Sequence, residues 1–213
     1  MDLLLASGNP KKLAELTQLV AGLGVRVLSP ADVGPLAEVD EDGATFEANA
    51  AKKATAWAAA AGVVCIADDS GLAVDALDGA PGVHSARYAG RHGDDAANNT
   101  KLLAALAATH GAARTARFVC ALAVVAPDGE VLARSRGTVE GRIALAPRGE
   151  AGFGYDPLFE CTEPSLPEGL CGRTFGELTH AQKALVSHRA RALQGLLGAL
   201  QRLRGADEHK AGR

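Results

Sequence analysis

Short apolar runs alternate with helix-forming segments through the first seventy residues. Leu3 to Ala6, Val25 to Leu28 and Val63 to Ala67 each have the length and apolar character of a buried strand. Between them, Lys11 to Leu23 and about Phe46 to Ala61 have the composition and spacing of helices. This alternation of strands and helices is typical of a three-layer α/β fold. The third strand is expected to end abruptly at the DDSG sequence that follows it.

The second half of the chain predicts a hairpin and two further helices. Phe118 to Val125 and Val131 to Val139 flank a Pro-Asp-Gly turn, which indicates an antiparallel pair. One helix is expected from about Asp94 to His110. A last helix begins at Thr179, where Gln182 completes a capping box. Its predicted apolar stripe consists of Leu185, Leu193, Leu196, Leu200 and Leu203. Because the second half adds an antiparallel hairpin to the alternating strands and helices of the first half, the sheet is expected to be mixed.

Length and charge limit the organisation and the partners of the chain. No Pro/Ser-rich linker divides the 213 residues, so we expect one domain over 1–204 and a frayed tail over 205–213. The net charge of -3 argues against a protein that coats nucleic acid or anionic lipid. The longest apolar stretch, Ala54 to Ala67, is too short for a bilayer span and is interrupted by Gly62.

The N-terminus and the cysteines favour a cytoplasmic location. No positive residue precedes Leu3, so no secretory signal is visible. The four cysteines show no CxxC spacing, and those at positions 65 and 120 lie in apolar runs, where a thiol behaves as a small hydrophobic group. We expect a soluble cytoplasmic protein without a nucleic-acid or membrane partner.

The SGNPKK segment lies between the first strand and the first helix. Asn9 is a suitable N-cap and Pro10 suits the first helical position, because its missing N–H would be unpaired there. Backbone N–H groups at a helix start attract anions, and Lys11 and Lys12 add positive charge. The segment is compatible with a phosphate cradle and equally with an ordinary turn that carries solvated lysines.

Two adjacent carboxylates, Asp68 and Asp69, follow the third apolar strand. Buried carboxylates are costly unless they are paired, hydrogen-bonded or bound to a cation. Mg²⁺ prefers such oxygens and retains several waters. If strand geometry continues, the two side chains point in opposite directions and one of them faces a site. The acidic segment from Asp40 to Asp42 is either a further source of metal ligands or an exposed acidic loop.

The GFGYDP sequence concentrates aromatic residues in a chain that has only 5 Phe, 2 Tyr and 1 Trp. Its glycines allow close approach of a ligand to the backbone, and Phe153 and Tyr155 offer faces for stacking a planar base. A tight turn with two core aromatics is the alternative. Phe159, beyond this motif, is expected to belong to the core. Lys183 and His188 would lie about 140° apart on one continuous helix, so both reach one ligand only across a helix end or in a cleft.

Taken together, these motifs resemble a known family. SGNPKKLAEL, DGATFEANAAKKA, ADDSGLAVDALDGAPGVHSARYAG, GFGYDPLF and ELTHAQKALVSHRARAL are similar, in order and spacing, to the inosine/xanthosine triphosphate pyrophosphatases. The similarity runs from about Leu3 to Leu200. One departure is FEANA, where many relatives have FEENA, so Ala48 offers no carboxylate at that position.

The resemblance implies a fold, an activity and a site. The fold would be an elongated mixed β-sheet flanked by helices, with two lobes and a central active-site cleft, in a homodimer. The activity would be Mg²⁺-dependent hydrolysis of ITP, dITP and XTP to the monophosphate and pyrophosphate, which keeps these nucleotides out of DNA and RNA. Asp69 would be the catalytic base and a metal ligand, with Asp40 or Glu41 as the second ligand. The implied substrate-binding residues are Ser7, Gly8, Asn9, Pro10, Lys11, Lys12, Lys53, Ser70, Phe153, Gly154, Tyr155, Asp156, Lys183, His188 and Arg189.

Two other functions remain open at this point. A related pyrophosphatase acting on other modified nucleotides would share the same motifs. A nucleotide-binding module without turnover would keep the SGN and GFGYDP segments but has no need for a carboxylate pair at a strand end.

Overall fold

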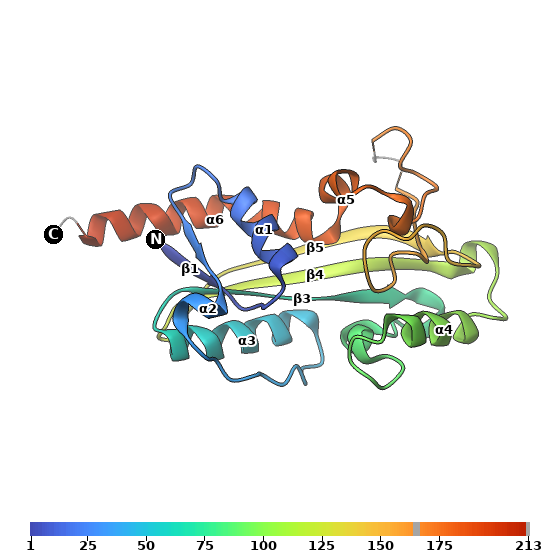
Figure 1. Cartoon of the computed structure of the whole chain (residues 1–213), viewed down its shortest axis with the longest axis horizontal. Helices are drawn as coiled ribbons and strands as arrows, with labels where there is room; N and C mark the ends of the chain where they lie inside the picture. Colours follow the sequence, from blue (N-terminus) through green and yellow to red (C-terminus); the bar gives the residue numbers. More distant parts are fainter. Residues whose placement is uncertain (164–166, 212–213) are drawn as a thin grey trace. The chain divides into compact units, whose positions relative to one another are not determined.

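The computed structural model describes residues 1–163 and 167–211. Figure 1 shows its strands and helices coloured along the sequence. In chain order they are β1 (Asp2–Leu5), α1 (Pro10–Leu19), β2 (Arg26–Leu28), α2 (Pro30–Val33), α3 (Phe46–Ala61), β3 (Cys65–Val74), α4 (Asp95–Ala105), β4 (Thr115–Val125), β5 (Val131–Ile143), β6 (Phe159–Cys161), α5 (His180–Val186) and α6 (His188–Ala211).

The strands form one mixed sheet in the order β2-β1-β3-β4-β5-β6. β1 pairs in parallel with both β2 and β3, and Leu4 lies opposite Cys65. β5 and β6 are antiparallel, with Ile143 opposite Phe159. A mixed sheet flanked by helices confirms the predicted α/β class. None of the described helices combines the length and apolar composition needed to cross a membrane.

The chain divides into two compact units. Unit 1 comprises Met1–Asp69, Ala121–Gly137 and the chain from Ala192 onward, and unit 2 comprises Ser70–Cys120 and Thr138–Arg191. The division falls within β3, β4 and β5, so each of these strands contributes residues to both units.

In unit 1, α3 packs on one face of the sheet through small side chains. Ala50, Ala54 and Ala58 recur every fourth residue and are fully buried in one cluster with Leu4 of β1 and with Cys65 and Ala67 of β3. The bounds of α3 agree with the predicted helix, and Thr45 Oγ1 caps it by accepting a hydrogen bond from Ala48 N at 3.1 Å. α1 lies on the opposite side of these strands from α3 (Figure 1).

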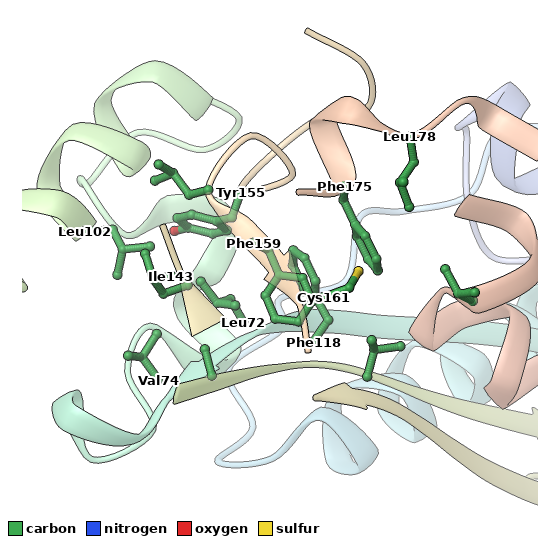
Figure 2. Close-up of a cluster of buried hydrophobic side chains, with 14 of the residues drawn as sticks. Leu72, Val74, Leu102, Phe118, Ile143, Tyr155, Phe159, Cys161, Phe175 and Leu178 are labelled. Atoms are coloured by element: carbon green, nitrogen blue, oxygen red, sulfur yellow. The ribbon is translucent and has the colours of Figure 1, made fainter. Parts of the chain in front are cut away.

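Aromatic rings form the centre of the unit 2 core. Phe118 lies 4.5 Å from Phe159 and 5.6 Å from Phe175 between ring centroids, and Figure 2 shows the three rings together. Phe159 and Phe175 are completely buried. The prediction that Phe159 belongs to the core is confirmed.

The predicted end of the third strand is wrong. β3 continues through Asp68 and Asp69 to Val74, because Leu72 and Val74 are fully buried and carry the apolar pattern onward. The two carboxylates do not end the strand, since each finds a polar partner on its own side, as described below.

The sequence predicts one continuous last helix, whereas the structure has two helices, α5 and α6, in its place. Ser187 has extended backbone angles, φ -69° and ψ 152°, between α5 and α6, and its Oγ accepts a hydrogen bond from Ala190 N at 3.2 Å. A serine that satisfies a free N–H in this way favours a new helix start over continuation. The Thr179–Gln182 capping box is confirmed at the start of α5.

Three smaller differences concern helix ends and one leucine. Leu185 is 72% exposed, so it does not belong to the predicted apolar stripe, whereas Leu193, Leu196 and Leu200 are buried. α4 ends at Ala105, short of the expected His110. The tail expected to fray from residue 205 is helical to Ala211, and residues 212–213 lie outside the described part of the chain.

Candidate active site

The two carboxylates on β3 in unit 1 have different partners. Lys12 Nζ of α1 contacts Asp68 Oδ1 at 2.8 Å, and the Asp68 side chain is 4% exposed. Asp69, which is 9% exposed, accepts a hydrogen bond at Oδ2 from Asn49 Nδ2 of α3 at 2.9 Å. Since α1 and α3 lie on opposite sides of the strand, the prediction that the carboxylates point in opposite directions is confirmed.

The segment from Ser7 to Pro10 enters α1 in a turn closed by local hydrogen bonds. Ser7 Oγ accepts from Asn9 N at 3.2 Å, and Asn9 O accepts from Leu13 N at 3.2 Å. Pro10 is the first helical residue, and Gly8 is exposed. The segment therefore presents a helix N-terminus next to the lysine that holds Asp68, while the side chain of Lys11 lies outside the described part.

Lys53 links the acidic loop to β3. Its ammonium forms an ion pair with Glu41 and lies 3.5 Å from the carbonyl oxygen of Asp68. Asp42 instead pairs with Lys52 at 2.6 Å, and this hydrogen bond lowers the pKa of Asp42. Asp40 is exposed. Of the acidic loop residues, Glu41 is therefore the one tied to the strand that carries Asp69.

These unit 1 residues could hold a divalent cation only in part, with other ligands completing its coordination. No group of three or more His, Cys, Asp or Glu side chains placed to hold a metal occurs within residues 1–163 and 167–211. Mg²⁺ in nucleotide enzymes is bound by one or two carboxylates, with waters and phosphate oxygens completing its octahedron. Asp69 and Glu41 supply such oxygens, and the Asn49 hydrogen bond orients the Asp69 carboxylate as outer partners orient metal ligands.

A cavity of about 130 Å³ lies within unit 2. Every site residue predicted in this unit lines it: Ser70, Phe153, Gly154, Tyr155, Asp156, Lys183, His188 and Arg189. Residues separated by more than a hundred positions in the sequence thus surround one volume. The break at Ser187 explains how Lys183 and His188 both reach it, since they belong to different helices.

The two aromatic residues of the GFGYDP motif differ in exposure. Phe153 is 49% exposed, and Lys183 Nζ lies 4.6 Å from its ring centroid. Tyr155 is 4% exposed and donates its hydroxyl to the carbonyl of Ser85 at 2.8 Å. Figure 2 shows its ring among the core side chains. Phe153 is therefore the ring available for stacking, whereas Tyr155 fixes the wall behind it.

Asp156 holds the turn of this motif from inside. It is 2% exposed, accepts a hydrogen bond at Oδ2 from Phe153 N at 2.8 Å and forms an ion pair with Lys183. Burial raises the pKa of Asp156, although the nearby Lys183 ammonium opposes this effect. Gly152, at φ +84°, is required here because a Cβ would lie 1.9 Å from the same carboxylate oxygen.

Helix α4 forms hydrogen bonds with both the N–H and the C=O group of Gly154. Gly154 N donates to Asp95 Oδ2 at 2.7 Å, and Asn99 Nδ2 donates to Gly154 O at 2.9 Å. Asp95 and Asn99 are four residues apart and so share one helix face. Sequence reasoning missed both residues, as it missed Asn49 and Ser85. The only sequence signal for Asp95 and Asn99 was their helical spacing, and nothing in the sequence linked them to Gly154, more than fifty positions away.

His188 and Arg189 begin α6 and are both buried. The imidazole of His188 stacks on the ring of Phe118, with centroids 4.8 Å apart and planes 18° apart. A ring held in this way cannot turn freely, so it presents a fixed edge to the cavity that it lines.

The chain is similar in sequence and in fold to known proteins. A family model described as the Ham1 family matches residues 3–199. The dITP/XTP pyrophosphatase of Anaeromyxobacter dehalogenans is 49% identical over 97% of this chain and 100% of its own length. The structure of a HAM1 protein from Coxiella burnetii superposes with a TM-score of 0.85 at 38% identity, over 95% of this chain and 99% of its own.

A second solved structure has higher sequence identity. The nucleoside-triphosphatase / dITP/XTP pyrophosphatase of Mycobacterium abscessus is 51% identical, with a TM-score of 0.75, over 92% of this chain and 99% of its own. These matches extend over nearly the whole of each protein. The chain belongs to the Ham1 family.

Proposed function

We propose that this chain is a Mg²⁺-dependent nucleoside-triphosphate pyrophosphatase. It hydrolyses ITP, dITP and XTP to the monophosphate and pyrophosphate, which keeps these nucleotides out of DNA and RNA, and it acts as a cytoplasmic homodimer. The convergence of the predicted nucleoside-binding residues on one cavity is the observation that carries the proposal. The printed name of the Anaeromyxobacter relative, dITP/XTP pyrophosphatase, points to the same substrates.

The unit 2 cavity is proposed to bind the purine. Phe153 stacks on the base, and Lys183 closes one side of the ring. Hypoxanthine and xanthine carry a 6-oxo acceptor where adenine carries a 6-amino donor. A donor from His188 or Arg189 directed at this position would be left facing a donor in ATP, and sites of this kind discriminate by about 10⁴–10⁵-fold.

The unit 1 residues are proposed to bind the triphosphate. The segment from Ser7 to Lys12, which leads into α1, offers backbone N–H groups and the ammonium of Lys12, and Lys53 adds a second positive charge. In the structure these two lysines hold Asp68 and Glu41. A triphosphate carries enough charge to draw both ammonium groups towards its oxygens. Asp69 and Ser70 are consecutive residues of β3, so the proposed base and a proposed substrate contact are joined by one peptide bond.

The chemical step is proposed as attack of water on the α-phosphorus. Asp69 accepts the proton of that water, the new P–O bond forms, and the bond from the α-phosphorus to the bridging oxygen breaks so that pyrophosphate leaves. Asn49 holds the Asp69 carboxylate in one orientation. A Mg²⁺ ion held by Asp69 and Glu41 would acidify the water and neutralise charge on the leaving group. Lys12 and Lys53 stabilise the same charge.

Product identity tests the proposal. The full chain is incubated with ITP, dITP, XTP, GTP, ATP and modified pyrimidine triphosphates, with and without Mg²⁺, and the phosphorus products are identified by ³¹P NMR. We expect IMP and pyrophosphate from ITP, only with the metal, and a much lower kcat/KM for ATP. Formation of IDP and orthophosphate would contradict the proposal. Preference for modified pyrimidine triphosphates in the same panel would instead support a related pyrophosphatase.

A further inference from the structure

A second and larger cavity lies within unit 2. Its volume is about 480 Å³, and it shares no lining residue with the nucleoside cavity. Its wall is formed by the end of β5 and the segment that follows, from Arg142 to Arg148, with Arg114, His110 and Glu160. None of these residues is used in the proposed hydrolysis.

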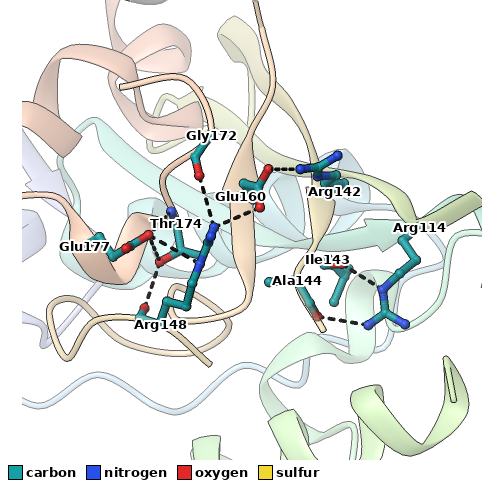
Figure 3. A network of polar contacts seen from close by, with 9 residues as sticks. All are labelled: Arg114, Arg142, Ile143, Ala144, Arg148, Glu160, Gly172, Thr174 and Glu177. Atoms are coloured by element: carbon teal, nitrogen blue, oxygen red, sulfur yellow. Dashed lines mark hydrogen bonds and ion pairs between the residues drawn. The ribbon is translucent and has the colours of Figure 1, made fainter. Parts of the chain in front are cut away.

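Two arginines of this cavity share one buried carboxylate. Glu160 is 6% exposed, and Figure 3 shows it between Arg142 and Arg148. Arg142 Nη2 pairs with Glu160 Oε1, and Arg148 Nη2 lies 2.8 Å from Glu160 Oε2. Each carboxylate oxygen is therefore already taken by a guanidinium. Arg148 Nε also lies 3.5 Å from Glu177 Oε2 (Figure 3), so these two arginines are matched by two carboxylates.

A third arginine adds a charge that no carboxylate balances. Arg114 is 4% exposed and donates to the carbonyls of Ile143 at 2.8 Å and Ala144 at 3.0 Å (Figure 3). Its Nη1 donates to the carbonyls of Leu106 and Thr109. Within residues 1–163 and 167–211 its partners are carbonyl oxygens only, which are neutral. Burial lowers the pKa of Arg114, but a guanidinium stays protonated in proteins.

The free donors of this wall point to the class of ligand. The Arg142 side chain is 52% exposed, and among the described residues only its Nη2 is engaged. A guanidinium has five N–H donors in a planar fork that matches the oxygens of a phosphate. Three guanidiniums against the two carboxylates of Glu160 and Glu177 leave an excess of one positive charge, that of Arg114, which concentrates small anions.

We propose that this cavity is a second ligand site of the chain and binds a small phosphate-type oxyanion. Arg142 and Arg148 form its binding edge, Glu160 holds them in place, and Arg114 braces the backbone below them. Ala144 N donates to Leu158 O at 2.8 Å and Arg148 N donates to Pro157 O at 2.9 Å, so the wall has a fixed backbone. The site does not depend on the proposed hydrolase activity.

NMR of the full chain tests the site directly. ¹⁵N-labelled protein is titrated with inorganic phosphate at constant ionic strength, with sodium chloride as the control titrant. We expect saturable shifts at the amides of residues 144–146 with phosphate and none with chloride. Pyrophosphate and IMP, titrated in the same way, distinguish a free diphosphate from a nucleotide phosphate as the source. An absence of saturable phosphate shifts at these amides would overturn the proposal.

Matched variants separate specific binding from net charge. Arg142→Gln should weaken phosphate binding at residues 144–146 by about tenfold, because it removes one charged contact to the phosphate. Arg202→Gln makes the same change in charge at an exposed position of α6 and should leave binding within about twofold. Equal weakening in both would overturn the proposal. Arg142→Lys, which keeps the charge and loses the fork, serves as the milder variant if Arg142→Gln loses its dispersed spectrum, and it should also weaken binding.

Discussion

The unit 1 cluster and the unit 2 cavity hold their polar side chains in different ways. In unit 1, charges oppose charges: Lys12 holds Asp68, and Lys53 holds Glu41. In unit 2, the wall is fixed mainly through its backbone, because α4 binds both peptide groups of Gly154 and Asp156 binds Phe153 N. Ion pairs can exchange partners when a charged ligand arrives, whereas a loop held by its backbone keeps its shape.

This difference suits two separate tasks. A triphosphate and a metal ion bring large charges, so the lysines and carboxylates that receive them must be able to change partners. A purine is distinguished by the position of one or two polar atoms, so its pocket must hold its form. We therefore expect variants of unit 1 to change the rate of the chemical step and variants of unit 2 to change affinity and selectivity.

Asp69→Asn should have the largest effect. Loss of a general base typically costs 10²–10⁴-fold, and we expect kcat for ITP to fall about 10³-fold with little change in binding. The variant keeps the shape of the side chain and a hydrogen-bonding oxygen for Asn49. Steady-state kinetics and ITP binding by calorimetry measure the two effects. Asp128→Asn, at an exposed turn, is the control, and full activity of Asp69→Asn would show that this carboxylate is not the base.

Lys183→Met should destabilise the protein in a pH-dependent manner. Removing one partner of a buried ion pair costs about 3–5 kcal/mol, because Asp156 is left charged and buried. Burial already raises the pKa of Asp156, and without the ammonium it rises further. A raised pKa in the folded state favours the folded protein at low pH and loses that contribution as pH increases.

Urea unfolding at several pH values measures this effect. The stability deficit of Lys183→Met relative to the unmodified chain should be largest near pH 8 and should shrink as pH falls towards 5. Lys101→Met, at an exposed lysine of α4, controls for the loss of a surface charge. A stability deficit that does not change with pH would show that Lys183 does not stabilise the protein through its ion pair with Asp156.

His188→Ala and Arg189→Ala should change selectivity. If either donor recognises the 6-oxo group, its removal lowers kcat/KM for ITP more than for ATP, and the ATP-to-ITP ratio rises by about tenfold or more. For each variant, kcat/KM for ATP and for ITP are measured on the same enzyme preparation, so a partial loss of folded protein cancels in their ratio. A ratio that stays constant in both variants would move base recognition to other residues.

Asn99→Ala should have the smallest effect of the series. It removes one hydrogen bond to Gly154 O and leaves Asp95 in place, so KM for ITP should rise about fivefold at nearly constant kcat. Thr100→Ala, at the next and exposed position of α4, is the matched control. A fall in kcat with constant KM would mean that α4 acts on the chemical step and that the contrast between the two units is wrong.

Sequence reasoning was most successful where local rules decide the structure. The bounds of α3 and the Thr179–Gln182 capping box depend on neighbours within a few residues, and both were predicted correctly. The opposite directions of Asp68 and Asp69 follow from strand geometry alone. The GFGYDP residues were identified by a resemblance whose motifs extend along nearly the whole chain.

What escaped prediction depends on contacts between distant segments. Asp95 and Asn99 hold a loop more than fifty residues away, and Asn49 orients a carboxylate on another element. The break at Ser187 was missed because the leucine spacing continues across it, although the serine could have been read as a second cap. The end of β3 was misjudged because two carboxylates suggested a loop, whereas partners on both faces keep them in the strand.

The most direct test of the central claim is the position of the oxygen taken from water. ITP is hydrolysed with Mg²⁺ in H₂¹⁸O, and the products are examined by ³¹P NMR and mass spectrometry. Attack on the α-phosphorus, as proposed for the Asp69 site, places ¹⁸O in IMP and leaves the pyrophosphate unlabelled. Label in pyrophosphate with unlabelled IMP, or release of labelled orthophosphate with IDP, would contradict the account.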